Sequence, residues 1–251
     1  METINGEFYM KGCAPEDPNR LRCAADLAAF LEKIGFLPLF ANELPGFSVE
    51  ERTTPDSWWS DDPETDPWNW RIVLAEEQSV AYGKFFDRKA AYISADWFPA
   101  FVNYRRDGYD FDARWDEGLV SHRAKKLMDA LAPDEEGRGL SLLSADLKQK
   151  AGFGKDGEKN FEGVLTDLQM QGYLLAGAFR QKVNRAGLPY GWHLAQIQTP
   201  ETKWGRDAVT AAYNERPEAS LARLEANILQ YLPDVNPSTL HRLLSLRRPR
   251  S

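Results

Sequence analysis

Residues 161–183 read "FEGVLTDLQMQGYLLAGAFRQKV", and a change of pattern inside this stretch decides the fold. Its first half places apolar residues at positions i, i+3, i+4 and i+7, namely Phe161, Val164, Leu165 and Leu168. This spacing predicts one apolar face of a helix, which Gly172 ends because glycine readily adopts the left-handed backbone conformation. The residues that follow, 173–183, are predicted to form a strand.

The segments on either side complete a characteristic order. Before the helix, Ser144 is predicted to cap a short helix over 145–151. After the strand, residues 184–187 ("NRAG") are predicted to form a hairpin tip, and residues 188–200 ("LPYGWHLAQIQTP") the returning strand. Helix, turn, helix and two-stranded hairpin is the order of a winged helix-turn-helix. We therefore predict an α+β fold that is mainly α with small β-hairpins, in a winged helix-turn-helix architecture.

Two glutamines on the returning strand, Gln196 and Gln198, raise the question of catalysis. Two amides one residue apart could hold a water molecule or a catalytic base. However, alternate residues of a strand point to the same side, and polar residues on one face are the usual pattern of a half-exposed hairpin. No acidic or nucleophilic residue is adjacent to the pair in sequence, so we interpret both glutamines as structural.

The rest of the chain is predicted to be mostly helical and to divide near residues 133–138. Residues 1–133 are predicted to form a helical or winged-helix-like domain with a tryptophan-rich loop. Residues 138–201 are predicted to form the winged helix-turn-helix, and residues 202–251 to form helices that pack back on the body.

Local signals place the helices of the N-terminal domain, which are predicted over 20–35, 67–82 and 118–132. Asp66 followed by Pro67 is a strong start signal for the second of these helices. A further helix is predicted to be interrupted by Pro99, and residues 109–118 are predicted to be a turn-rich link.

The charge of the chain is unevenly distributed. The 251 residues carry a net charge of −7, yet residues 138–206 hold 10 Lys and Arg against 6 Asp and Glu. A local basic region can attract phosphate even within an acidic protein. The tryptophan-rich segment 53–71 is different, because it contains five acidic residues that would repel phosphates. We therefore predict an ordered surface loop there, with stacking of its tryptophans on nucleobases as the alternative.

Several classes of protein are disfavoured. The sequence has no run of 18 apolar residues and no secretory signal, so we expect no membrane span and a cytoplasmic location. Cys13 and Cys23 are expected to be free thiols, although a disulfide between them is possible by number. The three histidines are far apart in sequence, and no nucleotide-binding or nucleophile motif is present, so neither a metal nor a cofactor is expected.

Double-stranded DNA is the predicted partner. Winged helices use cations on their second helix and wing to contact phosphates, and polar side chains on that helix to read bases. The candidate residues are Lys148, Lys150, Lys155, Lys159, Thr166, Gln169, Arg180, Lys182, Arg185, Arg105 and Arg106. Acidic residues such as Glu162 and Asp167 lie in the same region, so a module that docks onto another protein remains an alternative.

Three segments resemble the AlkZ/YcaQ winged-helix DNA glycosylases. They are "KIGFLPLFAN" (33–42), "NWRIVLAEEQSVAYGKFFDRKAAYISADWFPAFVNYRRDG" (69–108), and the region that starts "FEGVLTDLQMQGYLLAGAFRQ" and ends "YGWHLAQIQTPE" (161–201). Proteins of that family unhook alkylated and crosslinked bases. The resemblance implies a winged-helix fold and association with DNA.

The chain departs from that family at the catalytic motif. The family carries Gln, an apolar residue, then Gln or Asp, just after its first helix, whereas residues 35–40 here read "GFLPLF". Leucine and phenylalanine can neither hold the attacking water nor stabilise a cationic sugar. We therefore expect DNA binding without the usual catalytic pair. The alternative is an active glycosylase that uses Asp110, Asp112 or Glu43.

Overall fold

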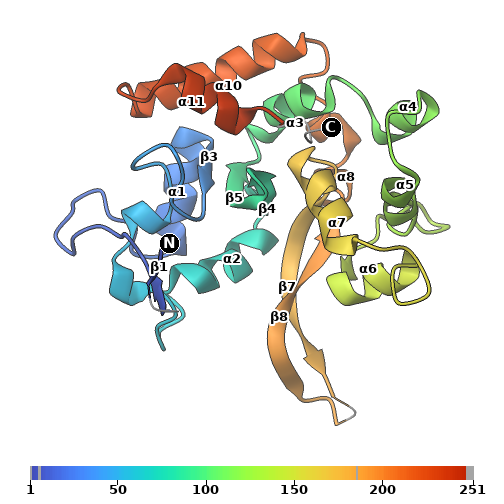
Figure 1. The fold of residues 1–251 in the computed structure, drawn as a ribbon, viewed down its shortest axis with the longest axis horizontal. Helices are drawn as coiled ribbons and strands as arrows, with labels where there is room; N and C mark the ends of the chain where they lie inside the picture. Colours follow the sequence, from blue (N-terminus) through green and yellow to red (C-terminus); the bar gives the residue numbers. More distant parts are fainter. Residues whose placement is uncertain (1, 5–6, 185, 247–251) are drawn as a thin grey trace.

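A six-stranded antiparallel sheet forms the centre of the protein (Figure 1). This computed structural model describes residues 2–4, 7–184 and 186–246. The strand order is β3-β5-β4-β7-β8-β6, and β1 (Glu2–Ile4) pairs separately with β2 (Glu7–Tyr9). The strands of the large sheet are β3 (Phe36–Pro38), β4 (Val80–Phe86), β5 (Lys89–Ser94), β6 (Leu142–Leu143), β7 (Leu175–Val183) and β8 (Pro189–Gln198). The predicted α+β class is confirmed, but the strands from β3 onward join into one sheet.

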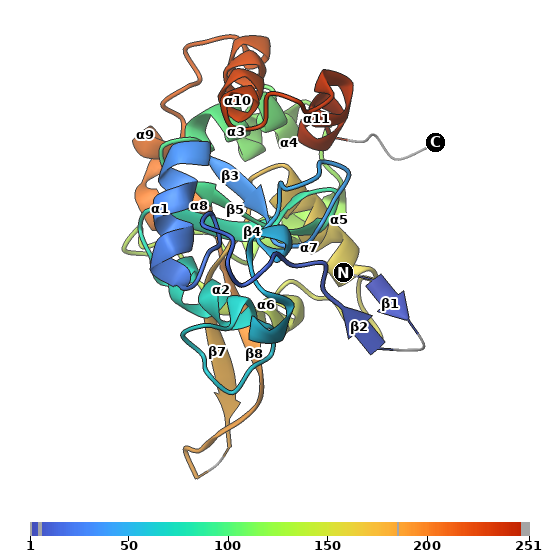
Figure 2. The ribbon, with the colours of Figure 1, turned by 90° about the vertical axis from the view of Figure 1, so that its left-hand side faces the viewer.

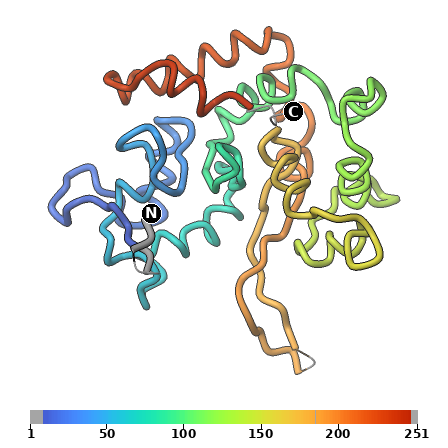
Figure 3. The backbone as a smooth tube through the Cα atoms, viewed as in Figure 1, coloured from blue at the N-terminus to red at the C-terminus, as the bar shows by residue number. Residues whose placement is uncertain are grey.

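Helices surround this sheet on several sides, as the ribbon and the backbone tube show (Figures 1 and 3). Those of the first half are α1 (Ala24–Ile34), α2 (Pro67–Glu76), α3 (Phe98–Arg106), α4 (Phe111–Asp116) and α5 (His122–Asp129). Those of the second half are α6 (Ser144–Lys150), α7 (Phe161–Met170), α8 (Pro200–Trp204), α9 (Arg206–Val209), α10 (Pro217–Tyr231) and α11 (Pro237–Leu244).

Prolines and caps explain where helices begin. The carboxylate of Asp66 accepts a hydrogen bond from the backbone N–H of Trp68 at 2.9 Å, which confirms the predicted start of α2. The prediction that α2 continues to residue 82 is wrong, because residues from Val80 onward pair with β5. Pro99 does not interrupt α3 but lies in its first turn, where a missing N–H costs nothing. The predicted link at 109–118 contains the short helix α4.

Residues 161–183, with which the sequence analysis begins, form the predicted helix and strand as α7 and β7. The four apolar residues of α7 that predicted its buried face are all buried: Phe161, Val164, Leu165 and Leu168. Gly172 follows α7 with a φ of 77°, and its N–H donates to the carbonyl of Gln169 at 2.8 Å. The helix before it starts one residue earlier than predicted, with Leu143 rather than Ser144 at the cap position.

Two glycines with the same backbone conformation allow the cost of packing at Gly172 to be measured. Gly172 and Gly152 have φ angles of 77° and 74°. A Cβ at Gly172 would lie 2.7 Å from Val102 Cγ1, whereas nothing lies within 4 Å at Gly152. We expect Gly152→Ala to lower the free energy of unfolding by about 1 kcal/mol and Gly172→Ala by about 3 kcal/mol, since overpacking adds to backbone strain. Urea denaturation measures both, and equal losses would show that Val102 yields without cost.

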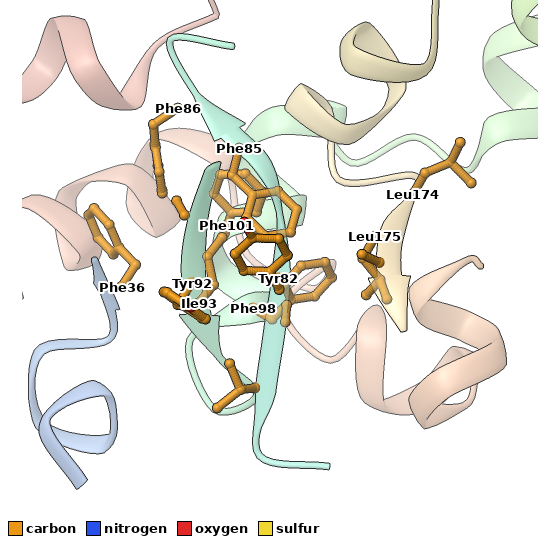
Figure 4. Close-up of a cluster of buried hydrophobic side chains, with 14 of the residues drawn as sticks. Phe36, Tyr82, Phe85, Phe86, Tyr92, Ile93, Phe98, Phe101, Leu174 and Leu175 are labelled. Atoms are coloured by element: carbon orange, nitrogen blue, oxygen red, sulfur yellow. The ribbon is translucent and has the colours of Figure 1, made fainter. Parts of the chain in front are cut away.

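Aromatic rings form much of the buried core (Figure 4). Phe85 of β4 packs edge-on against Phe98 and Phe101 of α3, with ring centroids 6.1 and 5.6 Å away. On the neighbouring strands, Tyr82 packs against Tyr92 at 5.0 Å and against Phe179 of β7 at 5.6 Å. The core therefore extends from the N-terminal strands into the β7–β8 hairpin.

The sheet crosses the predicted domain boundary. Strand β4 belongs to the N-terminal half and pairs with β7 of the C-terminal half through Tyr82 and Ala176. Past this junction, β7 and β8 leave the body and project as a long hairpin, which is visible from two directions (Figures 1 and 2). This geometry removes the outer part of the hairpin from the core and presents it to solvent.

Candidate nucleic-acid interface

The projecting hairpin carries large apolar side chains in full contact with solvent. Trp192 is 86% exposed and Tyr190 is 52% exposed, and Val183 and Leu188 are exposed beside them. Tyr190, Trp192 and Lys182 are here called the hairpin patch. Lys182 lies directly opposite Tyr190 in the strand register. Exposed apolar side chains that gather in one place mark surfaces that contact another molecule.

Local hydrogen bonds hold the hairpin in shape. At its tip, the carboxamide oxygen of Asn184 accepts from the backbone N–H groups of Ala186 and Leu188 at 2.9 and 3.0 Å. Along its edge, the amide of Gln181 donates to the carbonyl of Gly191 at 2.8 Å. At its base, Arg180 forms an ion pair with Glu76 of α2, so its charge is partly neutralised. The predicted site residue Arg185 lies outside the described residues.

Four predicted lysines are exposed near α6. Lys148 and Lys150 project from the helix itself, while Lys155 and Lys159 lie on the loop that joins α6 to α7. The ammonium of Lys159 is partly committed, because it donates to the carbonyl of Gly154 at 2.8 Å. The other three lysines remain accessible to a polyanion.

The two residues that were predicted to read bases are buried. Thr166 and Gln169 are only 4% and 5% exposed on the inner face of α7. The carboxamide oxygen of Gln169 accepts a hydrogen bond from the backbone N–H of Lys84 at 2.6 Å, which fixes β4 against α7. Buried side chains engaged in this way cannot reach a base edge, so both residues are structural.

Arg105 and Arg106, which were predicted to contact phosphates, are buried as well and do not reach the surface. Arg105 donates to the carbonyl of Met170 at 3.0 Å, and burial lowers its pKa to about 9. Arg106 bonds to Glu201 at 2.6 Å and to the carbonyl of Gly172 at 2.6 Å. Burial alone would lower the pKa of Arg106, but the charges of Glu201 and Tyr213 and the hydrogen bonds to both together outweigh it, and the pKa is raised. Both guanidinium groups join segments of the fold.

A large cleft lies along the exposed side of α7. Its volume is about 1130 Å³, and α7 contributes Val164, Asp167, Leu168 and Met170 to its wall. We call it the α7 cleft. Of the three carboxylates considered as catalytic alternatives, Glu43 lines this cleft and is paired with Arg242. Asp110 is paired with Arg206 outside it, and Asp112 is exposed on α4.

Gln196 and Gln198 share one face of β8, as predicted, and line a second pocket of about 350 Å³. Ile197 between them points the other way and is 1% exposed. The amide of Gln196 donates to the carbonyl of Ser141 at 3.2 Å, which ties β8 to the segment before β6. Lys203 lies in the same pocket, and no sequence signal pointed to it.

Lys203 is expected to titrate within the physiological range. Its ammonium donates to the carbonyl of Ala75 at 2.8 Å, and burial lowers its pKa to about 8 against the opposing charges of Glu77 and Glu76. The unfolded chain therefore binds this proton more tightly than the folded protein. Lys203 weakens the fold below pH 8, and this penalty disappears as the pH rises from about 8 towards 10.5.

The rate of acetylation of Lys203, followed by peptide mass spectrometry, should rise with pH and level off above about 8. The exposed residue Lys148 is the internal control in the same digest. A Lys203 rate that still climbs steeply above pH 9 would contradict the lowered pKa.

Fold and surface together define an α+β protein with a projecting hairpin of exposed aromatic and cationic side chains. The chain belongs to the AlkZ-related family, because the family model described as "AlkZ related" matches residues 21–245. The resemblance found in the sequence is thereby confirmed. No curated protein and no solved structure matches the chain.

Two further properties concern only the part of the chain that the structure describes. No helix there has the length and apolar character needed to cross a membrane. No group of three or more His, Cys, Asp or Glu side chains there could hold a metal ion. Cys13 and Cys23 are both free, as expected from the sequence.

Proposed function

We propose that this protein binds DNA as a winged-helix protein and that the hairpin is its wing. The element order α5-β6-α6-α7-β7-β8 supports this assignment, together with the pairing of β8 with both β6 and β7. A winged helix-turn-helix has this order, with the second helix of the motif followed by a two-stranded wing. Membership of the AlkZ-related family makes DNA the natural partner.

The observation that carries the proposal is the hairpin patch. Trp192 offers a flat aromatic surface at 86% exposure, with Tyr190 and Lys182 nearby. Bases stack on exposed aromatic rings, and neighbouring cations hold the phosphates that connect those bases. Lys148, Lys150 and Lys155 extend the cationic surface onto α6 and its following loop.

The second helix of the motif is expected to contribute little sequence reading. Most of α7 is buried, and its exposed residues include the acidic Glu162 and Asp167. Carboxylates repel the phosphates on either side of a groove, so this face is unsuited to base readout. Binding through the wing and the lysines alone implies weak preference for DNA sequence.

We further propose that the usual catalytic pair of the family has been lost. The segment after α1 forms β3, where Phe36 and Leu37 are 1% and 0% exposed and pack into the core. An apolar buried strand cannot hold an attacking water. Glycosylase activity through Glu43 is the second candidate, and the position of this carboxylate in the wall of the α7 cleft favours it.

Fluorescence anisotropy across a salt series tests the proposal, with intact and N7-alkylated duplexes compared side by side. We expect log Kd to rise with log salt with a slope of about 3 to 5, since each phosphate contact contributes about 0.9. Release of the alkylated base would establish glycosylase activity, and its loss in Glu43→Gln would assign it. Absence of binding at low salt would overturn DNA binding and favour a protein-docking module.

A further inference from the structure

We propose that the α7 cleft binds a nucleoside phosphate. This inference rests on the proposed function and adds to it, because it concerns a site separate from the hairpin patch. The position of the cleft, the charges of its wall and its apolar lining residues support this inference.

The position of the cleft is unusual for a winged helix. In such folds the exposed side of the second helix faces a DNA groove. Here, the turn between β4 and β5 lies over α7, because Arg88 forms an ion pair with Asp167 and a hydrogen bond to the carbonyl of Gly163. Asp167, on the exposed side of α7, therefore lies in the wall of a cleft and not on an open reading surface.

The turn that lies over α7 is held in a conformation that its residues disfavour. Asp87 and Arg88 both have positive φ angles, of 48° and 62°. Non-glycine residues rarely adopt this conformation, but a two-residue hairpin turn between strands such as β4 and β5 requires it at both central positions. The N–H of Arg88 contacts the sulfur of Met170 at 3.2 Å, which adds a third contact between the turn and α7.

The wall of the cleft carries a net positive charge, whereas the whole protein is negative. Five cations line it: Lys11, Arg88, Lys89, Arg114 and Arg242. They face three carboxylates, those of Glu43, Asp87 and Asp167, which leaves a surplus of two positive charges in a protein of net charge −7. A concave surface with such a surplus attracts anions.

Two of the ion pairs in the wall can exchange partners. The side chains of Arg88 and Asp167 are 54% and 56% exposed, and those of Arg242 and Glu43 are 49% and 58% exposed. Exposed pairs of this kind contribute at most about 1 kcal/mol. A phosphate dianion can therefore compete for either arginine, and a guanidinium binds two phosphate oxygens at once.

Arg114 also lines the cleft, and its Nη1 donates to the carbonyl of Arg106 at 3.2 Å. Phe111, Leu168 and Leu243 form apolar surface nearby in the same cleft.

These features together fit a ligand with an anionic end and a flat, largely apolar body. A volume of about 1130 Å³ is ample for one nucleotide. Such a nucleotide has two possible sources. It could come from a bound strand as an extruded residue, or from solution as a free nucleotide.

Isothermal titration calorimetry with deoxyadenosine monophosphate tests the inference. We expect binding at least about tenfold tighter than that of deoxyadenosine or inorganic phosphate alone, since each half of the ligand contributes. Leu119→Trp fills the exposed part of the cleft from a position that is 56% exposed, and Arg114→Gln removes one cation from the wall. Both variants should weaken binding about tenfold or more, while Arg223→Gln, an exposed arginine outside the cleft, should not.

Duplexes with and without one extrahelical adenosine distinguish the two sources. Tighter binding of the bulged duplex, abolished by Leu119→Trp and competed by deoxyadenosine monophosphate, assigns the nucleotide to the strand. Equal binding of both duplexes, with the free nucleotide still bound, assigns it to solution.

If deoxyadenosine monophosphate binds no better than phosphate and Leu119→Trp changes no affinity, the inference is overturned. That failure would leave salt-dependent binding of flush duplex intact, and it is therefore separable from failure of the proposed function.

Discussion

Replacing Trp192 by alanine is expected to weaken DNA binding about tenfold, because stacking of a base on an aromatic ring contributes about 1 to 3 kcal/mol. The ring of Trp192 is 86% exposed, so its removal sacrifices almost no buried contact in the free protein. The melting temperature should therefore remain unchanged. Trp192→Phe should retain most of the affinity, since it keeps a flat ring at the same position.

An exposed tryptophan elsewhere provides the matched control. Trp59, in the tryptophan-rich segment, is 47% exposed and has its ring 5.9 Å from that of Trp58. Trp59→Ala should leave DNA affinity unchanged, because acidic residues surround that segment. Anisotropy with a single duplex and a single strand measures all three variants. Loss of binding in Trp59→Ala with none in Trp192→Ala would move the interface to the tryptophan-rich segment.

The second large effect concerns stability. Arg106→Leu is expected to lower the free energy of unfolding by about 3 kcal/mol, because it leaves the buried carbonyl of Gly172 and the half-buried carboxylate of Glu201 without their donor. Besides Glu201, the guanidinium of Arg106 contacts the hydroxyl of Tyr213 at 3.3 Å and lies 4.4 Å from the centre of the Tyr173 ring. One side chain thus joins α3, the turn after α7 and the C-terminal helices.

Urea denaturation of single and double variants separates the ion pair from the packing. Glu201→Leu alone should also lower the free energy of unfolding, since it leaves the guanidinium of Arg106, which is 1% exposed, without its carboxylate partner. Arg106→Leu combined with Glu201→Leu should recover part of the loss, because replacing both partners with apolar groups removes the desolvation cost. Strictly additive losses would show that the pair contributes nothing beyond its individual contacts.

Local signals predicted the elements of the fold well. The spacing of Phe161, Val164, Leu165 and Leu168 placed α7, and Asp66 with Pro67 placed the start of α2, because both patterns act within one or two turns of helix. The order of the sheet did not follow from such signals. The first residues of β4, up to Tyr82, were predicted as the end of a helix, because the pairing of β4 with β5 and β7 depends on contacts between distant residues.

The candidate site was predicted less well, for an electrostatic and a topological reason. Arginine normally lies at the surface, so Arg105 and Arg106 were read as phosphate ligands, whereas each is buried against carbonyl groups. The apolar spacing of α7 placed Thr166 and Gln169 on its exposed side. Both are buried, because the fold covers more of this helix than the spacing indicates. The α7 cleft is lined by segments from residue 11 to residue 246, and no local sequence pattern predicts that these segments lie together.

The exposed loop around residues 134–138 connects two halves that share one sheet. Beyond the pairing of β4 with β7, Asn103 of α3 donates to the hydroxyl of Ser220 at 2.9 Å, and Asn227 donates to the carbonyl of Ile34 at 2.7 Å. A protease that nicks this loop should therefore yield two fragments that stay associated and elute together. Neither fragment alone would have a complete core, so each should be insoluble or unfolded until mixed with the other. The chain can accordingly be divided at this loop into two fragments that restore the fold when they associate. Association of the fragments would then control binding of the ligand that the whole protein binds.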